Sequence, residues 1–214
     1  MQTMSQAFDT AFHSERLLYR PVDLTDEDKK YFYEAMFSDP VIVGLGSPSL
    51  LRPKTRSQSD DDLSSILKDS LLAVMICLLP QEDSLAASTS GEKAAGDASK
   101  PVPIGFLSMS KLSESMQQMR FTRIGIQLAA PYQNKGYGGE AINWALDWAF
   151  KWAGMRKVEI GTASYNERAA HLYRKLGFVD EGRRRGVVFM NGEWFDMIGL
   201  GMMLDEWKAL RGIE

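Results

Sequence analysis

The segment Ala129-Ala-Pro-Tyr-Gln-Asn-Lys-Gly-Tyr-Gly-Gly-Glu-Ala141 decides the fold of this chain. It follows the apolar run Ile124-Gly-Ile-Gln-Leu128, which predicts a buried strand, and precedes an apolar helix pattern from Ala141 to Trp152. The glycines let the backbone approach a ligand, and the first turn of the helix offers unpaired N–H groups. The sequence therefore predicts a strand, loop and helix that bind phosphate oxygens, with Lys135 as an added charge.

The spacing of the loop glycines distinguishes this loop from two common phosphate-binding loops. It lacks the Gly-x-x-x-x-Gly-Lys-Ser/Thr pattern of P-loops, and it is not a Gly-x-Gly-x-x-Gly that follows an N-terminal strand. It does match Gln-x-x-Gly-x-Gly at Gln133, Gly136 and Gly138. If the loop is considered alone, the alternative to a ligand-binding loop is a glycine-rich connection that binds no ligand.

Composition and charge indicate an ordinary globular domain. The chain has 214 residues, of which 44% are hydrophobic and 25% charged, and its net charge of −3 does not suggest a nucleic-acid partner. The single cysteine, Cys77, excludes an intramolecular disulfide and a cysteine-based zinc site, and we expect no metal. Without a membrane-spanning run or a signal peptide, we expect a soluble, cytoplasmic protein with no membrane partner.

The rest of the chain is divided by its turn signals and hydrophobic patterns. We predict a flexible leader at residues 1–13 and one domain at 14–210, with a mobile low-complexity loop at about 80–101. The predicted strands are 14–21, 71–79, 104–110, 119–128, 157–163 and a C-terminal hairpin that turns at Asn191-Gly192; the predicted helices are 23–37, 57–69, 141–152 and one that starts at Asn166, and 44–53 is a predicted loop.

The strand, helix and strand around the glycine-rich loop predict a specific topology. The helix is apolar on most of its circumference, and its polar residues Asn143, Asp147 and Lys151 share one narrow stripe. A short return to the strand at 157–163 predicts a parallel, right-handed crossover. The anion site then lies at the carboxyl end of a strand, where α/β proteins usually bind ligands.

A second motif follows at Asn166, Ala169, Tyr173, Gly177 and Phe178, spaced as Asn-x-x-Ala-x-x-x-Tyr-x-x-x-Gly-Phe. Asn166 can cap a helix that Gly177 ends. The two motifs, in this order and at this interval, resemble the GNAT family of N-acetyltransferases. The C-terminal hairpin resembles the subgroup of ribosomal-protein-alanine and polyamine N-acetyltransferases. The resemblance covers roughly residues 14–207 and is specific from residue 124 onward.

This resemblance implies a single-domain acyl-CoA N-acyltransferase fold of the α/β (α+β) class, with a mixed, mostly antiparallel central sheet flanked by helices. It implies acetyl-CoA as co-substrate and direct attack by a primary amine in a ternary complex. The amine belongs to a protein or peptide N-terminus, a polyamine or a small molecule. The implied cofactor contacts are Gln127, Leu128, Ala129, Gln133, Asn134, Lys135, Gly136, Tyr137, Gly138, Gly139, Asn166 and Tyr173.

The resemblance also implies catalytic roles. Tyr173 protonates the leaving thiolate, and Asn166 holds the pantetheine arm from the same helix face. A backbone N–H near Leu128 or Ala129 stabilises the oxyanion. No general base is assigned among Glu114, Glu159, Glu167 and Glu193, and neither His13 nor His171 is favoured.

A non-catalytic acyl-CoA-binding sensor or scaffold is the alternative function. Such a module could lose Tyr173, so the presence of this tyrosine favours the enzyme. A homodimer is left open.

Overall fold

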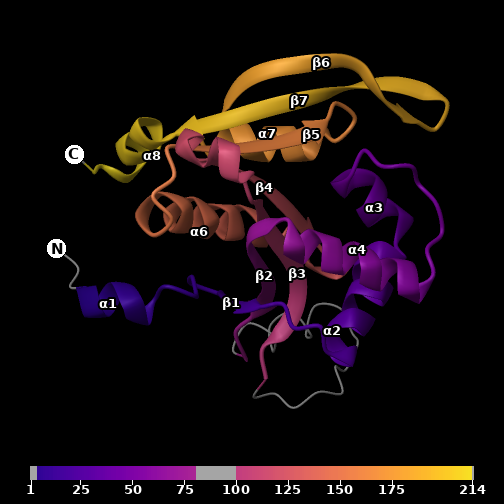
Figure 1. Cartoon of the computed structure of the whole chain (residues 1–214), viewed down its shortest axis with the longest axis horizontal. Coiled ribbons are helices and arrows are strands. Elements are labelled where there is room, and N and C mark those ends of the chain that lie inside the picture. Colours follow the sequence, from indigo (N-terminus) through magenta and orange to yellow (C-terminus); the bar gives the residue numbers. More distant parts are fainter. Residues whose placement is uncertain (1–3, 81–99, 214) are drawn as a thin grey trace.

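A seven-stranded sheet forms the centre of the computed structural model, which describes residues 4–80 and 100–213 (Figure 1). The strands follow the order β1-β2-β3-β4-β5-β7-β6. Only β4 and β5 are parallel neighbours, and every other neighbouring pair is antiparallel. The strands are β1 (Leu17–Pro21), β2 (Ser70–Leu78), β3 (Val102–Ser110), β4 (Phe121–Leu128), β5 (Lys157–Ala163), β6 (Val179–Met190) and β7 (Glu193–Met203).

Helices cover both faces of this sheet. Figure 1 shows α2, α3 and α4 grouped on one side of the strands and α6 on the other. The first group is α2 (Asp26–Tyr31), the π-helical turn η1 (Phe32–Phe37), α3 (Pro40–Gly46) and α4 (Arg56–Lys68), and the second is α6 (Tyr137–Lys151), α7 (Glu167–Lys175) and α8 (Leu204–Arg211). Two 3-10 turns, η2 (Glu114–Met119) and η3 (Ala130–Tyr132), flank β4. The mixed sheet between helices confirms the predicted fold class.

Each face of the sheet has its own hydrophobic core, because successive side chains of a strand point to opposite faces. In β2, Val74 and Ile76 pack with α6, whereas Met75 between them packs with η1 and α4. In β3, Leu107 and Phe106 divide in the same way. The buried strands were therefore predicted with nearly their observed bounds.

Two helical segments differ from the prediction. The predicted loop at 44–53 begins inside α3, because the Asp39 side chain accepts the N–H groups of Val41 and Ile42 and Pro40 occupies the first helical position. The predicted helix at 23–37 starts later, at the Thr25 cap of α2, and continues as η1. Helix α8 was not predicted.

The N-terminal segment contacts α6 at Phe8 and Ala11. Met4–Asp9 form helix α1. The indole of Trp144 in α6 donates to the Ala11 carbonyl at 3.0 Å, and the Phe8 and Trp152 rings lie 5.6 Å apart. These contacts hold part of the predicted flexible leader against α6.

The predicted mobile loop at about 80–101 lies almost wholly outside the described residues. Within 4–80 and 100–213, no helix has both the length and the apolar character that crossing a membrane requires.

Candidate active site

The two parallel strands at the centre of the sheet separate toward their carboxyl ends. β4 and β5 are paired only as far as Ile124 and Ile160. β4 continues to Leu128 and β5 to Ala163, so the backbone N–H and C=O groups that face each other over these last residues are not hydrogen-bonded between the two strands. A gap of this kind can accept the backbone-like amides of a ligand.

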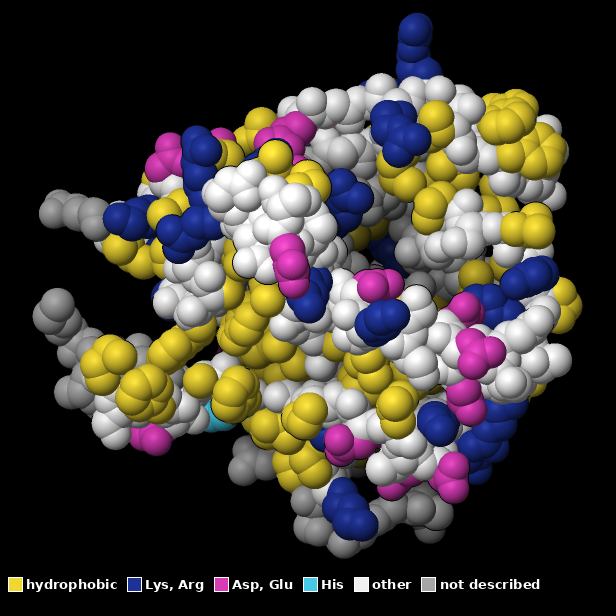
Figure 2. All heavy atoms as spheres, viewed as in Figure 1, with side chains coloured by type: hydrophobic (Ala, Val, Ile, Leu, Met, Phe, Trp, Pro, Cys, Tyr) yellow, Lys and Arg dark blue, Asp and Glu magenta, His cyan; other side chains and the backbone are white. Residues whose placement is uncertain are grey.

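A cleft of about 1370 Å³ opens at this gap and is lined by residues of α3, β4, α6, β5, α7, β6 and β7. Figure 2 shows it as a hollow beside the β6–β7 hairpin, with Lys and Arg side chains (dark blue) at its edge. Pockets for one small molecule measure roughly 300–1,000 Å³. This cleft therefore has room for a co-substrate and an acceptor together.

The glycine-rich loop ends in the first turn of α6, which begins at Tyr137 rather than at the predicted Ala141. Gly136 caps the helix with φ of 85°, in the left-handed region that favours glycine. Gly138 and Gly139 lie in the first turn and line the cleft. The unpaired N–H groups of this turn thus border the cleft and can bind an anion.

Most of the predicted cofactor contacts surround the cleft. Those that line it are Gln127, Leu128, Gln133, Asn134, Gly136, Gly138, Gly139, Asn166 and Tyr173. Lys135 and Tyr137 do not. The Lys135 ammonium lies 5.9 Å from the centre of the Tyr132 ring, and the Tyr137 side chain is buried in the core below the loop. Only the backbone of Tyr137 can therefore face a ligand.

The backbone also decides between Leu128 and Ala129 as oxyanion donors. The Ala129 N–H donates to the Ile104 carbonyl on β3 at 2.9 Å, so it has no free hydrogen, and Ala129 is not among the residues that line the cleft. Successive N–H groups of a strand point to opposite sides. The N–H of Leu128 therefore points away from β3, into the gap.

The loop and the first turn of α6 are tied to the segment just before β1 by residues that the sequence did not indicate. Arg16 donates through Nη1 to the Lys135 carbonyl at 3.2 Å and through Nε to Glu140 Oε2 at 2.8 Å. The Ser14 hydroxyl and the Arg16 N–H donate to the other carboxylate oxygen at 2.6 and 2.8 Å. Glu140 lies in the first turn of α6. Arg16 thus neutralises a carboxylate that would otherwise repel a bound phosphate.

Arg168 of α7 ties the other side of the loop. Its guanidinium donates to Gln133 Oε1 at 2.8 Å and to Asn134 Oδ1 at 3.0 Å, while Gln133 Nε2 donates to the Leu128 carbonyl at 2.9 Å. Arg168 and Lys175 both line the cleft. These two residues bring positive charge to the cleft, whereas the sequence predicted such a charge only from Lys135.

Tyr173 reaches the cleft from the buried face of α7. It is 8% exposed, and its hydroxyl has no hydrogen-bond partner among the described residues. Burial raises the pKa of this phenol to about 12, so the hydroxyl is protonated at neutral pH. The residue can therefore donate a hydrogen bond to a group in the cleft.

Asn166 also borders the cleft, but its side-chain amide is already hydrogen-bonded within the protein. Its Oδ1 accepts the Ala169 N–H at 3.2 Å as the cap of α7, and its Nδ2 donates to the Leu45 carbonyl of α3 at 3.1 Å. Asn166 thus joins α7 to α3 across the opening. This places it in a structural role beside the predicted one.

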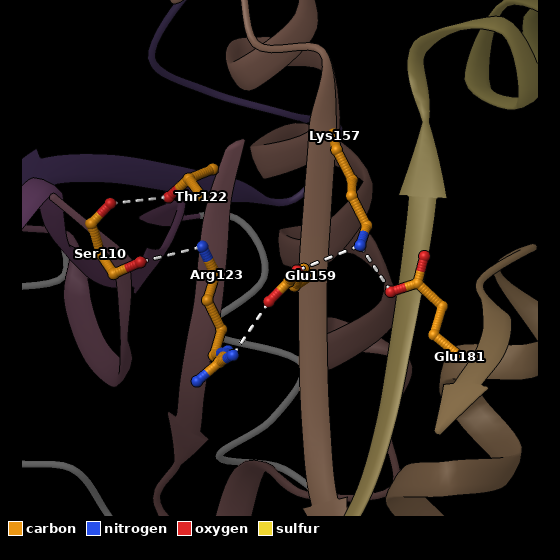
Figure 3. Close-up of polar contacts among 6 residues, drawn as sticks. All are labelled: Ser110, Thr122, Arg123, Lys157, Glu159 and Glu181. Carbon is orange, nitrogen blue, oxygen red and sulfur yellow. Dashed lines mark hydrogen bonds and ion pairs between the residues drawn. The ribbon is translucent and has the colours of Figure 1, made fainter. Parts of the chain in front are cut away.

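A row of charges crosses the sheet on the α3 side (Figure 3). Glu159 of β5 pairs with Arg123 of β4 at 2.9 Å and with Lys157 at 3.1 Å, and Lys157 pairs with Glu181 of β6 at 2.7 Å. Burial alone would raise the pKa of Glu159, but the hydrogen bonds from Arg123 and Lys157 hold it below its usual value. This carboxylate therefore stays ionised and paired.

The structure places only some of the acidic and histidine residues considered above at the cleft. Glu159 lines the cleft, whereas Glu114, Glu167 and Glu193 do not. His171 lines it from the exposed side of α7, and His13 hydrogen-bonds the Asp9 carbonyl at 2.8 Å. Among the described residues of the cleft, both carboxylates, Glu159 and Glu181, are ion-paired. These pairs favour water as the proton acceptor.

Thr162 is a cleft residue that sequence reasoning missed. It is 6% exposed, lines the cleft, and its Oγ1 is buried without a hydrogen-bond partner in the described structure. Buried hydroxyls are nearly always paired, so this one indicates a place for a ligand.

Residues 4–80 and 100–213 contain no cluster of three or more His, Cys, Asp or Glu side chains that could hold a metal ion.

Known proteins share this architecture. Spermidine N-acetyltransferase from Vibrio cholerae, solved with CoA and spermine, has a TM-score of 0.67 to this chain at 19% identity, covering 91% of this chain and 99% of that one. A GNAT-family acetyltransferase from Bacillus anthracis has a TM-score of 0.68 at 18% identity, covering 91% and 98%. At these identities the likeness shows the fold.

Sequence similarity points the same way over a shorter span. Vibrio cholerae spermidine N(1)-acetyltransferase is 36% identical over 78 residues, 36% of this chain and 45% of the relative. The uS5-alanine N-acetyltransferase of Escherichia coli is 23% identical over 88 residues, 41% and 45%. The chain thus spans about half the length of the curated relatives that it matches. The sequence profile of the acetyltransferase (GNAT) domain matches residues 16–179, more than half of the chain. The chain therefore belongs to the GNAT acetyltransferase family.

Proposed function

We propose that this protein is an acetyl-CoA-dependent N-acetyltransferase that moves the acetyl group to a primary amine in a ternary complex. One observation carries the proposal. A single cleft joins the N–H groups of the first α6 turn, the gap between β4 and β5, and the Tyr173 hydroxyl. These are a site for phosphate, an edge for amides and a proton donor, in one continuous space.

The residues of the cleft fit the parts of acetyl-CoA. The first turn of α6, with Arg168 and Lys175 nearby, suits the phosphates. The free edge of β4 and the unpaired Thr162 hydroxyl suit the amides of the pantetheine arm. When bound, acetyl-CoA supplies an acetyl group activated as a thioester.

The chain's own groups would act on the two charges that the transfer creates. The amine nitrogen bonds to the acetyl carbonyl carbon as the carbon–sulfur bond breaks, so the amine loses a proton and the sulfur gains one. The Leu128 N–H faces the gap and can stabilise negative charge on the carbonyl oxygen. The ion-paired carboxylates leave the amine proton to water.

Tyr173 acts at the departing sulfur. Its pKa of about 12 keeps the proton on the phenol, whereas a thiol has a pKa of about 8.5. Complete transfer of the phenol proton to the sulfur would be uphill, so the sulfur takes its proton from the water that accepts the amine proton. Donation of a hydrogen bond, which stabilises the leaving thiolate, is the step that the burial of this hydroxyl supports.

The test combines binding with turnover. We expect acetyl-CoA, but not ATP, to raise the melting temperature, and a panel of amines to release free thiol from acetyl-CoA. Tyr173→Phe should keep the rise in melting temperature and lose most of the turnover. Tyr33→Phe, a matched change in η1 away from the cleft, should keep both.

The outcomes separate the two functions considered above. A rise with acetyl-CoA and no turnover with any amine would support the sensor or scaffold in place of the enzyme. No rise at millimolar acetyl-CoA would contradict both.

A further inference from the structure

The cleft continues from the β4–β5 gap across the α3 side of the sheet, over a floor of glycines. We use the name glycine floor for Gly125, Gly161, Gly199 and Gly182, which lie on β4, β5, β7 and β6 and all line the cleft. Gly199 is paired with Gly161 on one side and with Gly182 on the other, so these three face the same way. The floor therefore runs across adjacent strands.

The space above Gly182 and Gly199 is open, whereas a methyl group at Gly161 would lie 3.1 Å from the Ile198 carbonyl oxygen and one at Gly125 would lie 3.2 Å from the Ser108 hydroxyl oxygen. A methyl group added at Gly182 would meet nothing within 4 Å, and one added at Gly199 would be 3.8 Å from the nearest atom, the Gly182 carbonyl oxygen. Neither glycine has a positive φ, so the backbone does not require glycine there. These two glycines therefore provide room for a ligand that lies close to the sheet.

The charges along the floor are unequal. At one end the carboxylates of Glu159 and Glu181 are already paired with Arg123 and Lys157 (Figure 3). A cationic acceptor would have to displace these partners. At the other end Arg184 of β6 is exposed, lines the cleft and forms no ion pair with any described residue. In this row Arg123, Lys157 and Arg184 are three cations against the two carboxylates Glu159 and Glu181, while Arg183, which also lines the cleft, is paired with Asp196 at 2.6 Å.

We propose that the cleft binds the amino end of an extended peptide that carries Asp or Glu at its second or third residue, and that Arg184 selects this side chain. The proposal rests on the proposed function, which places the reacting amine at the β4–β5 gap. It predicts an acceptor opposite in charge to spermidine, the molecule in the name of the Vibrio cholerae relative.

The dimensions favour a peptide over a free amino acid. Arg184 is on β6, two strand spacings from β5, which is roughly 10 Å. An extended chain advances about 3.3 Å per residue, so a carboxylate at the second or third residue can reach the guanidinium. A free amino acid carries its amine and carboxylate on one carbon and cannot span this distance. A polyamine would bring further positive charge toward Arg184.

The first experiment compares three peptides that differ only at the third residue: Glu, Gln or Lys. Acetylation is measured as thiol release from acetyl-CoA, with spermidine as a fourth acceptor. An exposed ion pair contributes modestly, so we expect kcat/KM for the Glu peptide to exceed that for the Gln peptide by roughly two- to fivefold at low salt. The Lys peptide and spermidine should be poorer still, and added salt should shrink the differences.

Variants assign the preference to one side chain. Arg184→Gln should remove the preference for Glu over Gln, and Arg184→Glu should turn it toward Lys. Arg185→Gln is the matched control, because it removes the same charge from the next residue, which does not line the cleft. Gly199→Ala should lower kcat/KM for all peptides by filling the floor, while Gly44→Ala, which also meets nothing within 4 Å but lies in α3, should not.

The outcomes are distinguishable. If wild type acetylates the Gln peptide or spermidine as well as the Glu peptide, or if Arg184→Gln keeps the preference, the inference is wrong while the acetyltransferase stands. If acetyl-CoA raises the melting temperature but no acceptor reacts, the proposed function fails and the inference falls with it.

Discussion

The unpaired hydroxyl of Thr162 leads to a prediction in which stability and binding change in opposite directions. Its Oγ1 is buried and has no partner among the described residues, although the side chain borders the cleft. Thr162→Val replaces the hydroxyl by a methyl group of similar shape. We expect the ligand-free protein to become more stable and acetyl-CoA to bind less tightly.

The magnitudes follow from the two states of the hydroxyl. A buried polar group without a partner costs about 1–3 kcal/mol, and removing it should stabilise the ligand-free protein by about 1 kcal/mol. In a domain of this size that corresponds to roughly 2–4 °C in melting temperature. A hydrogen bond to the ligand contributes about 0.5–1.5 kcal/mol, so its loss should raise the Kd for acetyl-CoA roughly two- to tenfold.

The assay is thermal melting across a titration of acetyl-CoA, which measures both quantities on one sample. Two controls isolate the mechanism. Thr122→Val removes an equally buried hydroxyl that donates to the Ser110 carbonyl at 3.0 Å, so it should destabilise the protein and leave the Kd unchanged. Ser59→Ala removes another buried, unpaired hydroxyl outside the cleft, so it should not destabilise the protein or alter the Kd.

Two results would refute the reasoning. If Thr162→Val destabilises the ligand-free protein as Thr122→Val does, the hydroxyl has a partner in that state. If the Kd is unchanged, the hydroxyl does not contact acetyl-CoA.

Two further predictions concern charged groups. Arg16→Gln should weaken acetyl-CoA binding roughly fivefold at low salt, because it leaves the Glu140 carboxylate uncompensated in the first turn of α6. The double variant Arg16→Gln, Glu140→Gln should recover the affinity in a titration with acetyl-CoA. An equal loss of affinity in the single and the double variant would contradict this role of Arg16. The pKa of Glu159 is lowered by folding, so its pairs stabilise the protein above the ordinary value of 4.5 and this contribution is lost as the pH falls below it. Urea unfolding between pH 6 and 3 should therefore show a shallower decline for Glu159→Gln than for wild type, and parallel curves would exclude a role for these pairs.

Many features of this protein could be predicted from the sequence because they depend on interactions between residues that are close in the chain. The Asn166 cap, the left-handed Gly136 and the Asn191-Gly192 turn, with φ of 50° and 84°, each depend on neighbours within a few residues. Strand bounds followed from alternation of buried residues. The short return after α6 predicted the parallel pair β4 and β5, which the register confirms.

Other local features were missed for local reasons. The Asp39-Pro40 pair lies just beyond the predicted helix at 23–37, and these two residues cap and begin α3, which was not predicted. The apolar pattern predicted the helix after the glycine-rich loop only from Ala141. The observed first turn lies before that pattern and contains Gly138 and Gly139, although glycine lowers helix propensity.

The sequence by itself determined the succession of the strands and of the helices α4, α6 and α7, the place of the glycine-rich loop and the presence of Tyr173 downstream of it, because these depend on periodicity, capping and spacing along the chain. Only the tertiary structure decided which side chains complete the site. Arg16 meets Glu140 across 124 positions, Arg168 meets Gln133 across 35, and the Thr162 hydroxyl is left unpaired where two strands separate. A contact between distant positions depends on how the sheet and helices pack, and no local pattern encodes it.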